Sequence, residues 1–257
     1  MTKVIALDAG HGLYTPGKQT PDRIKEWTLN DKVRDKIVEM LSDYDVKFIF
    51  PDNNEGKADE SLTSRRTMYV NQKVDAAVSI HHNAFTGEWG KATGVEVFTD
   101  RKATAADKEL ASLIYENLPD YIGLKGRGIK QANFSVIYQN KVPAVLVEGG
   151  FMDSTIDHPV ITSEKGQNGY ARAVAEGLIA FLDLKKKVDT NTPFKVKFKM
   201  NMNVRDGAGT KNKKVDVAKK NYVYTITETV MVGKTLWGRL KSGVGWVSIA
   251  DKYCDRV

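Results

Sequence analysis

Short apolar runs alternate with amphipathic stretches through the first 184 residues of the chain. Runs of Val, Ile, Leu and Ala predict strands, whereas apolar residues three or four positions apart predict helices with one buried face. The predicted strands cover residues 3–8, 46–50, 76–80, 94–99 and 144–148, with a short further strand at 135–138. The predicted helices cover residues 26–43, 62–72, 104–117 and 167–184. This alternation indicates an α/β fold, with a mostly parallel twisted sheet flanked by helices.

The pattern changes after residue 184. A polar, lysine-rich stretch at residues 185–193 ends in Pro193 and predicts an interdomain linker. Beyond it, short β-rich runs at residues 194–198, 222–232 and 237–240 are separated by glycine turns, which predicts a small all-β barrel. We therefore expect one domain at residues 1–184 and a second at residues 194–257.

The chain has a formal net charge of +7, and this charge is unevenly distributed. Residues 185–257 hold 17 Lys and Arg against 6 Asp and Glu, whereas the first 184 residues hold 22 against 26. A basic second domain attracts polyanions through long-range fields, and a mildly acidic first domain argues against nucleic acid as the substrate. The alternative is that these lysines only solvate a small barrel.

Composition and the N-terminal segment narrow the class of protein. Hydrophobic residues make up 41% of the chain and charged residues 28%, as is typical of a soluble globular protein. The only cysteine is Cys254, so no disulfide can form within the chain. The segment MTKVIALDAGHG lacks the features of a secretory signal, and no stretch approaches the ~18 to 20 apolar residues of a membrane span. We expect cytoplasmic synthesis, no membrane insertion and a monomer.

Four polar residues stand next to the predicted elements: His11, Glu26, His81 and Glu148. Three of them lie at the ends of apolar strands, and Glu26 opens a helix. Each also has a structural alternative, since a histidine beside glycines is often a turn residue and a glutamate complements a helix N-terminus. Burial of a polar group without a partner costs a few kcal/mol, so His81 and Glu148 require a partner or a function.

Other polar residues near the motifs are less informative. His82 points away from His81 by strand alternation, so we expect a neighbour rather than a ligand. His158 precedes a proline and is predicted to lie in a loop. Asp8 is either an orienting partner of a ligand or a strand-end turn residue. Candidates for substrate contact are Asn83, Arg127, Lys130 and Asn133.

Two histidines and one glutamate are sufficient for a catalytic zinc site. Such sites use three protein ligands and leave a fourth position open. His11, Glu26 and His81 could hold one Zn²⁺, which would polarise an amide carbonyl and lower the pKa of water toward ~7. Glu148 is then free for general acid and base work, which is typically worth ~10² to 10⁴ in rate.

The motifs together carry a resemblance to a known family. Between Lys3 and Leu184 the chain holds, in order, DAGHG, Glu26 with Asn30 one turn on, LTSRR, VDAAVSIHHNA and VPAVLVEGGFMDS. In this combination they resemble the zinc-dependent N-acetylmuramoyl-L-alanine amidases of the third amidase family.

The resemblance implies a zinc ion bound by His11, Glu26 and His81, with Glu148 as the catalytic carboxylate. The chain departs from the common pattern at two positions: Leu13 stands where another glycine is frequent, and His82 replaces a small residue. Neither departure removes a ligand, but both affect the expected shape of the substrate groove.

The C-terminal part resembles the bacterial SH3-like domains that commonly bind cell walls in lytic enzymes. The resemblance rests on NVRDGAGT at residues 203–210 and GWV at residues 245–247. Asp206 and Ala208 depart from the common form of the first motif, so its turn is expected to differ.

The resemblances imply a peptidoglycan hydrolase that cuts the amide between N-acetylmuramic acid and L-alanine. The expected partners are the peptidoglycan of Gram-positive walls and, through the basic second domain, anionic wall polymers. A phage endolysin released by a holin, or an autolysin that acts on lysis of the producing cell, fits a chain without a secretory signal. The alternatives are another zinc-dependent wall peptidase or deacetylase, and a non-catalytic protein that binds walls or polyanions.

Overall fold

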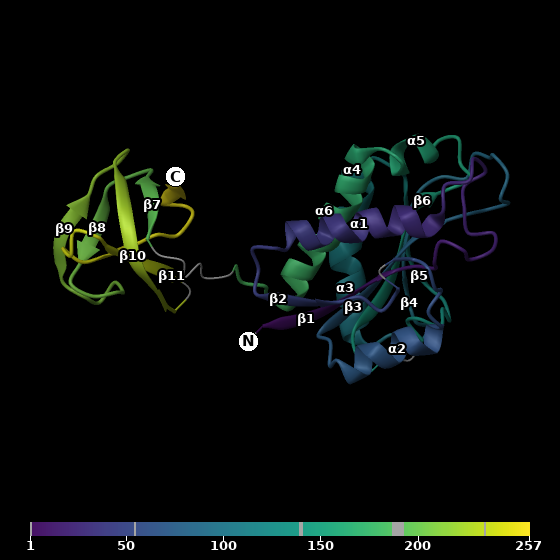
Figure 1. The fold of residues 1–257 in the computed structure, drawn as a ribbon, viewed down its shortest axis with the longest axis horizontal. Helices are drawn as coiled ribbons and strands as arrows, with labels where there is room; N and C mark the ends of the chain where they lie inside the picture. Colours follow the sequence, from purple (N-terminus) through teal and green to yellow (C-terminus); the bar gives the residue numbers. More distant parts are fainter. Residues whose placement is uncertain (1, 54, 139–140, 187–192, 234) are drawn as a thin grey trace. The chain divides into compact units, whose positions relative to one another are not determined.

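The computed structural model of the chain describes residues 2–53, 55–138, 141–186, 193–233 and 235–257. The chain divides into two compact units, Met1–Lys186 and Lys187–Val257 (Figure 1). Each unit has a hydrophobic core of its own. Most of the predicted linker at residues 185–193 lies outside the described residues.

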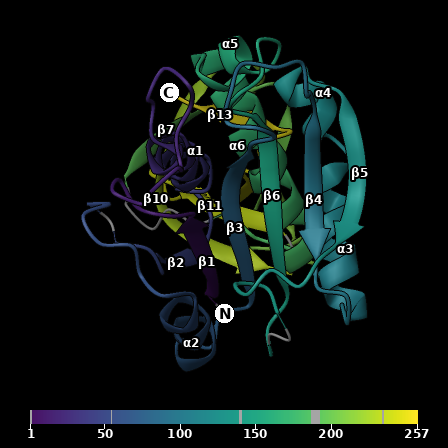
Figure 2. The ribbon, with the colours of Figure 1, turned by 90° about the vertical axis from the view of Figure 1, so that its right-hand side faces the viewer.

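The first unit is built on a six-stranded sheet with the order β2-β1-β3-β6-β4-β5, which can be followed from left to right in Figure 2. Its strands are β1 (Lys3–Ala9), β2 (Val46–Ile49), β3 (Ala76–Asn83), β4 (Val95–Thr99), β5 (Gly126–Gln131) and β6 (Ala144–Phe151). Four pairings of neighbouring strands are parallel, but β4 runs antiparallel to β6, so the sheet is mixed. A parallel return needs a crossover of a dozen or more residues, usually helical, and the connection from β3 to β4 contains no helix.

Helices cover both faces of this sheet. They are α1 (Glu26–Met40), α2 (Leu62–Asn71), α3 (Ala105–Tyr115), α4 (Leu118–Ile122), α5 (His158–Ile161) and α6 (Glu164–Leu182). Ile5 and Leu7 of β1 belong to the core formed with α1, α3, α4 and α6, whereas Ala6 packs in a second cluster with Tyr69 of α2. Figure 1 shows α2 on the opposite side of the sheet from α1. Because both faces are covered, the central strands β1, β3 and β6 are apolar over most of their length, and most of their polar residues lie toward their C-terminal ends.

Several local predictions were wrong. Residues 135–138 form a turn rather than a strand, although Val136 and Ile137 are buried in the cluster below α2. Strand β5 was not predicted, because GRGIKQ contains one large apolar residue and no apolar alternation. The short helices α4 and α5 were also missed, and His158 opens α5 instead of lying in a loop.

Strands β3 and β6 extend three residues beyond their predicted ends. The two strands pair with each other in parallel, and this pairing continues through His81 opposite Glu148 to Asn83 opposite Phe151. The polar residues that seemed to end these strands therefore lie inside them, where a neighbouring strand satisfies the backbone.

The second unit is an antiparallel sheet with the order β13-β7-β10-β11-β12-β8-β9. Its strands are β7 (Phe194–Phe198), β8 (Met202–Arg205), β9 (Lys214–Ala218), β10 (Val223–Val232), β11 (Thr235–Leu240), β12 (Trp246–Ser248) and β13 (Cys254–Arg256). Its core includes Val196, Phe198, Ile226 and Val247. The predicted β-rich runs correspond to β7, β10 and β11. None of the described helices of the chain combines the length and apolarity that a membrane crossing requires.

Candidate metal centre

His11 lies in the turn that follows β1, with its backbone in the left-handed region at φ 68°. This conformation is uncommon for a residue with a side chain and often marks a functional site. Gly10 makes room for the turn, since a Cβ at this position would lie 2.1 Å from Cε1 of His81. Only glycine at position 10 therefore allows the β1 turn and the His81 ring to lie against each other.

Glu26 is the first residue of α1 and joins the two histidines. Its Oε1 lies 3.0 Å from Nδ1 of His81, and its Oε2 lies 3.4 Å from Nε2 of His11. The imidazole rings are perpendicular, with centroids 5.0 Å apart. One potential ligand atom from each of the three residues lies within 4.8 Å of the others. The structure thus brings together three side chains that are distant in sequence, from the turn after β1, from α1 and from β3.

These three side chains have the chemistry and spacing of a zinc site. Bonds of ~2.0 to 2.2 Å in a tetrahedral site place neighbouring ligand atoms about 3.3 to 3.6 Å apart. The 3.4 Å between Glu26 Oε2 and His11 Nε2 lies in this range, whereas the 3.0 Å between Glu26 Oε1 and His81 Nδ1 is a hydrogen-bond distance. The side chain of Glu26 is only 2% exposed, whereas those of His11 and His81 retain 21% and 14% of their surface. The histidine side of the cluster is therefore open to an incoming ligand.

The electrostatics of the cluster keep two of its three groups, His11 and Glu26, in the form that binds a metal. Burial lowers the pKa of His11 to about 4, so its imidazole is neutral at pH 7. Burial would raise the pKa of Glu26, but the hydrogen bond and charge of His81 outweigh it and lower this pKa to about 2. Burial also disfavours a charged His81, yet the bond to Glu26 raises the pKa of His81.

Glu148 lies on β6 directly opposite His81 of β3. Its Oε2 is buried and has no hydrogen-bond partner among the described residues. Burial raises the pKa of Glu148 to about 8; His81 opposes this shift, and Glu26 and Glu96 add to it. A carboxyl group that is uncommitted, close to a metal-ligand cluster and perturbed in pKa is suited to proton transfer.

His82 and Asn30 form a second layer behind the cluster. The His82 side chain is buried, and its Nδ1 lies 2.8 Å from Oδ1 of Asn30. The amide of Asn30 in turn donates to the carbonyl of Gly10 at 3.1 Å. His82 therefore links β3, α1 and the β1 turn, and it is not among the three clustered ligand candidates.

Arg65 of α2 is a site residue that the sequence did not single out. It is 1% exposed and forms an ion pair with Asp8, and its Nη2 donates to the carbonyl of His11 at 2.8 Å. Asp8 also accepts from Ser79 at 3.0 Å, so it reaches His11 only through Arg65. The available signal was the helical spacing of Arg65 and Tyr69, which are both buried on the face of α2 toward the sheet.

Glu96 is a second site residue that the sequence did not single out, and it lies opposite Glu148 in the pairing of β4 with β6. It is 3% exposed and forms ion pairs with Arg127 and Lys130. The amide of Asn83 also donates to it at 2.7 Å. Three of the candidates for substrate contact are therefore engaged with Glu96, and the fourth, Asn133, is exposed.

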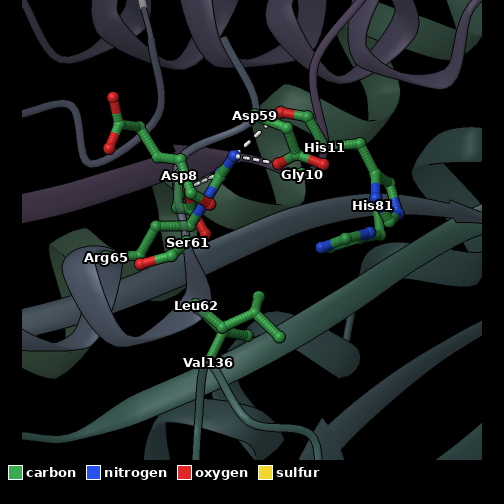
Figure 3. Close-up of a pocket in the computed structure, with 10 residues that line it drawn as sticks. Asp8, Gly10, His11, Asp59, Ser61, Leu62, Arg65, His81 and Val136 are labelled. Carbon is green, nitrogen blue, oxygen red and sulfur yellow. Dashed lines mark hydrogen bonds and ion pairs between the residues drawn. The ribbon is translucent and has the colours of Figure 1, made fainter. Parts of the chain in front are cut away.

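A pocket of about 250 Å³ adjoins the cluster. In Figure 3, His11 and His81 lie side by side at one edge of this pocket, and Arg65 and Leu62 lie further along it. The full lining consists of Asp8, Gly10, His11, Asp59, Glu60, Ser61, Leu62, Arg65, His81 and Val136. The pocket gives a substrate group room next to the histidines.

Comparison with known proteins identifies the family of the chain. The N-acetylmuramoyl-L-alanine amidase family matches residues 5–180 of the chain. An endolysin of Bacillus phage SPP1 is 30% identical over 271 aligned residues, which cover 98% of this chain and 98% of that protein. A sporulation-specific N-acetylmuramoyl-L-alanine amidase of Bacillus subtilis is 29% identical over 184 residues, covering 71% of this chain and 69% of that protein.

A solved structure shows the same fold. The crystal structure of an N-acetylmuramoyl-L-alanine amidase from Clostridium difficile 630 superposes with a TM-score of 0.66 at 30% identity, covering 71% of this chain and 97% of that one. The chain belongs to the N-acetylmuramoyl-L-alanine amidase family and is a peptidoglycan amidase.

Proposed function

We propose that this amidase is zinc-dependent, with one Zn²⁺ held by His11, Glu26 and His81 and with Glu148 as the proton-transfer residue. The observation that carries the proposal is the convergence of three ligand atoms within 4.8 Å of one another, next to an open pocket. When bound, Zn²⁺ would polarise the scissile carbonyl, acidify a nearby water and favour the ionised form of Glu148.

Glu148 supplies the proton chemistry of the reaction. Its Oε2, which has no hydrogen-bond partner within the described part of the chain, accepts a proton from the attacking water as the water oxygen bonds to the carbonyl carbon. The same group then protonates the nitrogen of L-alanine as the C–N bond breaks. The products are a lactyl carboxylate on the sugar and a stem peptide with a free amino group.

Removal and return of the metal tests the proposal. We expect the purified chain to contain about one zinc per molecule, to lose amino-group release from purified walls in chelator, and to regain it with added zinc. Sugar reducing ends should not increase, because no glycosidic bond is cut. Full activity of a metal-free chain would contradict the proposed zinc dependence. It would not contradict the conclusion that the chain is an amidase.

We further propose that residues 1–184 form the catalytic domain, that residues 185–193 link it to residues 194–257, and that the latter are an SH3-like wall-binding domain. The antiparallel sheet of the second unit and its excess of basic residues support this assignment. The phage endolysin aligns with 98% of the chain and therefore also with much of this unit. This likeness supports a role in lysis of the host cell, with peptidoglycan and anionic wall polymers as partners.

A further inference from the structure

Phe85 is exposed on a loop whose backbone is held by a buried carboxylate. The loop joins β3 to β4, and the Phe85 side chain is 77% exposed. Asp153, which is 2% exposed, accepts hydrogen bonds from the backbone N–H groups of Phe85, Thr86 and Gly87, each at 2.8 Å. Hydrogen bonds to a carboxylate are about twice as strong as those between neutral groups. These three bonds therefore fix the backbone that carries the exposed Phe85 ring.

The end of the same loop is fixed as well. The N–H of Gly90 donates to the carbonyl of Asp153 at 2.8 Å, and the N–H of Thr155 donates to the carbonyl of Gly90 at 2.9 Å. Between these contacts and Phe85 lies Trp89, which is 46% exposed. The loop thus presents two aromatic rings, four positions apart, on a backbone tied to the segment that follows β6.

This loop follows the strand that carries His81 and contacts the segment after β6. Trp89 contacts the ring of His158 edge-on at 5.0 Å between centroids. His158 Nε2 lies 3.2 Å from a carboxylate oxygen of Asp22, which belongs to the loop after His11. The loops that follow His11 and His81 therefore meet at α5, and Figure 1 shows both at the same end of the first unit.

Stability does not explain the exposed rings. A single exposed apolar side chain is ordinary, but neighbouring ones on a fixed loop next to an active site are typical of a binding surface. Aromatic rings supply a flat apolar face at low entropic cost, and their hydrogen-bonded loop is preorganised for a ligand.

The chemistry of the substrate indicates what would bind there. The scissile carbonyl carbon is three bonds from the muramic acid ring, or about 4 Å along the bonds. Phe85 follows the ligand candidate His81 by four residues, so it lies within about 14 Å along the chain. A glycan strand continues through many sugar rings on either side of the scissile amide, so a strand whose amide reaches His11 and His81 can place a sugar ring at Phe85.

We propose that Phe85, with Trp89 on the same loop, binds the apolar faces of sugar rings in the glycan strand. This inference rests on the amidase activity and concerns the sugar side of the scissile amide. Phe85 is a substrate-positioning residue in this account, since it holds the strand while the amide lies at the metal centre.

Competitive inhibition by glycan strands that carry no stem peptides tests the proposal on the full chain. A competitive inhibition constant measures binding at the active site alone. Glycan binding by the second unit therefore does not change the measured constant. The substrate is a soluble muramoyl peptide, and the variants are Phe85→Ala, Phe85→Tyr and Met40→Ala. Met40 is a matched control, because it is 38% exposed and lies at the opposite end of α1, about 20 Å from Glu26.

We expect Phe85→Ala to weaken inhibition by glycan roughly tenfold, and Phe85→Tyr and Met40→Ala to leave it unchanged. Inhibition by free stem peptide should be the same in all variants. Unchanged glycan inhibition in Phe85→Ala, or a selective loss of peptide inhibition, would overturn the proposal. Hydrolysis by the wild-type chain in the same assay tests the amidase function separately, and unchanged thermal unfolding excludes a folding defect.

Discussion

Arg65 holds the backbone carbonyl of His11 through a hydrogen bond of 2.8 Å from its Nη2. The same guanidinium donates to the carbonyl of Ala9 at 3.0 Å and forms an ion pair with Asp8, so it binds the end of β1 at several points. His11 has a positive φ of 68°, which costs free energy unless its surroundings hold it in place. Arg65 is therefore a positioning residue for one ligand candidate.

Arg65→Lys should lower zinc affinity about 10- to 100-fold, because Lys keeps the charge but not the planar fork of donors. The readout is zinc retention against a competing chelator, with thermal unfolding measured alongside. Arg66→Lys on the same helix is the matched control, since Arg66 is only partly buried. Equal zinc affinity in Arg65→Lys and the wild type would show that His11 does not depend on this contact.

Gly10→Ala should disrupt the metal centre without touching a ligand residue. The new Cβ would lie 2.1 Å from a carbon of the His81 ring, so the ring or the turn must move. We expect loss of stoichiometric zinc and of hydrolysis, both measured on the purified variant. Gly17→Ala is the control, because no atom lies within 4 Å of its Cβ, and only the strain of a positive φ remains. A Gly10→Ala variant with normal zinc content would contradict the close packing of Gly10 against His81.

Glu148 should make the metal-free protein less stable as pH rises. Its folded pKa is raised to about 8 from an ordinary 4.5, so the folded state binds more protons than the unfolded state between these values. Stability is therefore lost over this range and is lowest above pH 8. Glu148→Gln cannot ionise, so its stability advantage in chelator should grow from about pH 5 to pH 8 in denaturant unfolding. An advantage that does not change with pH would contradict the raised pKa.

Wall binding by the second unit should depend on salt. Its basic residues outnumber its acidic ones, 17 to 6 from residue 185 onward, and exposed charges are screened within about 10 Å at 0.1 M salt. We expect the full chain to pellet with purified walls at low salt and progressively less at high salt. Walls stripped of anionic polymers should bind less of the chain at low salt. Binding that is unaffected both by higher salt and by removal of the polymers would exclude an electrostatic contribution.

The central elements were predictable because their sequences have a strong period. The apolar runs of β1, β3 and β6 identify buried strands without knowledge of their partners, and the spacing of Val33, Ile37 and Leu41 does the same for the buried face of the predicted helix at residues 26–43. Polar residues following such runs indicated His11, His81 and Glu148, since strand ends on one side of a sheet lie together.

The remaining features depend on contacts between distant segments. The sequence does not show that β4 returns antiparallel, nor that the polar strand β5 pairs with it. Arg65 pairs with Asp8, 57 residues away, and Asp153 binds the backbone of residues 85–87, 66 to 68 residues away. The residues next to Arg65 and Asp153 in the sequence therefore do not indicate that either is buried. The extent of β3 and β6 likewise follows from their mutual pairing and not from apolar content.

Substitution of Glu148 by Gln separates metal binding from proton transfer and tests the central claim most directly. Gln has nearly the same shape but cannot take up a proton as a base, and Glu148 is not one of the clustered ligand candidates. We expect Glu148→Gln to contain about one zinc per chain while its release of stem-peptide amino groups falls by at least ~10². A zinc-loaded Glu148→Gln variant that hydrolyses walls at the wild-type rate would contradict the account.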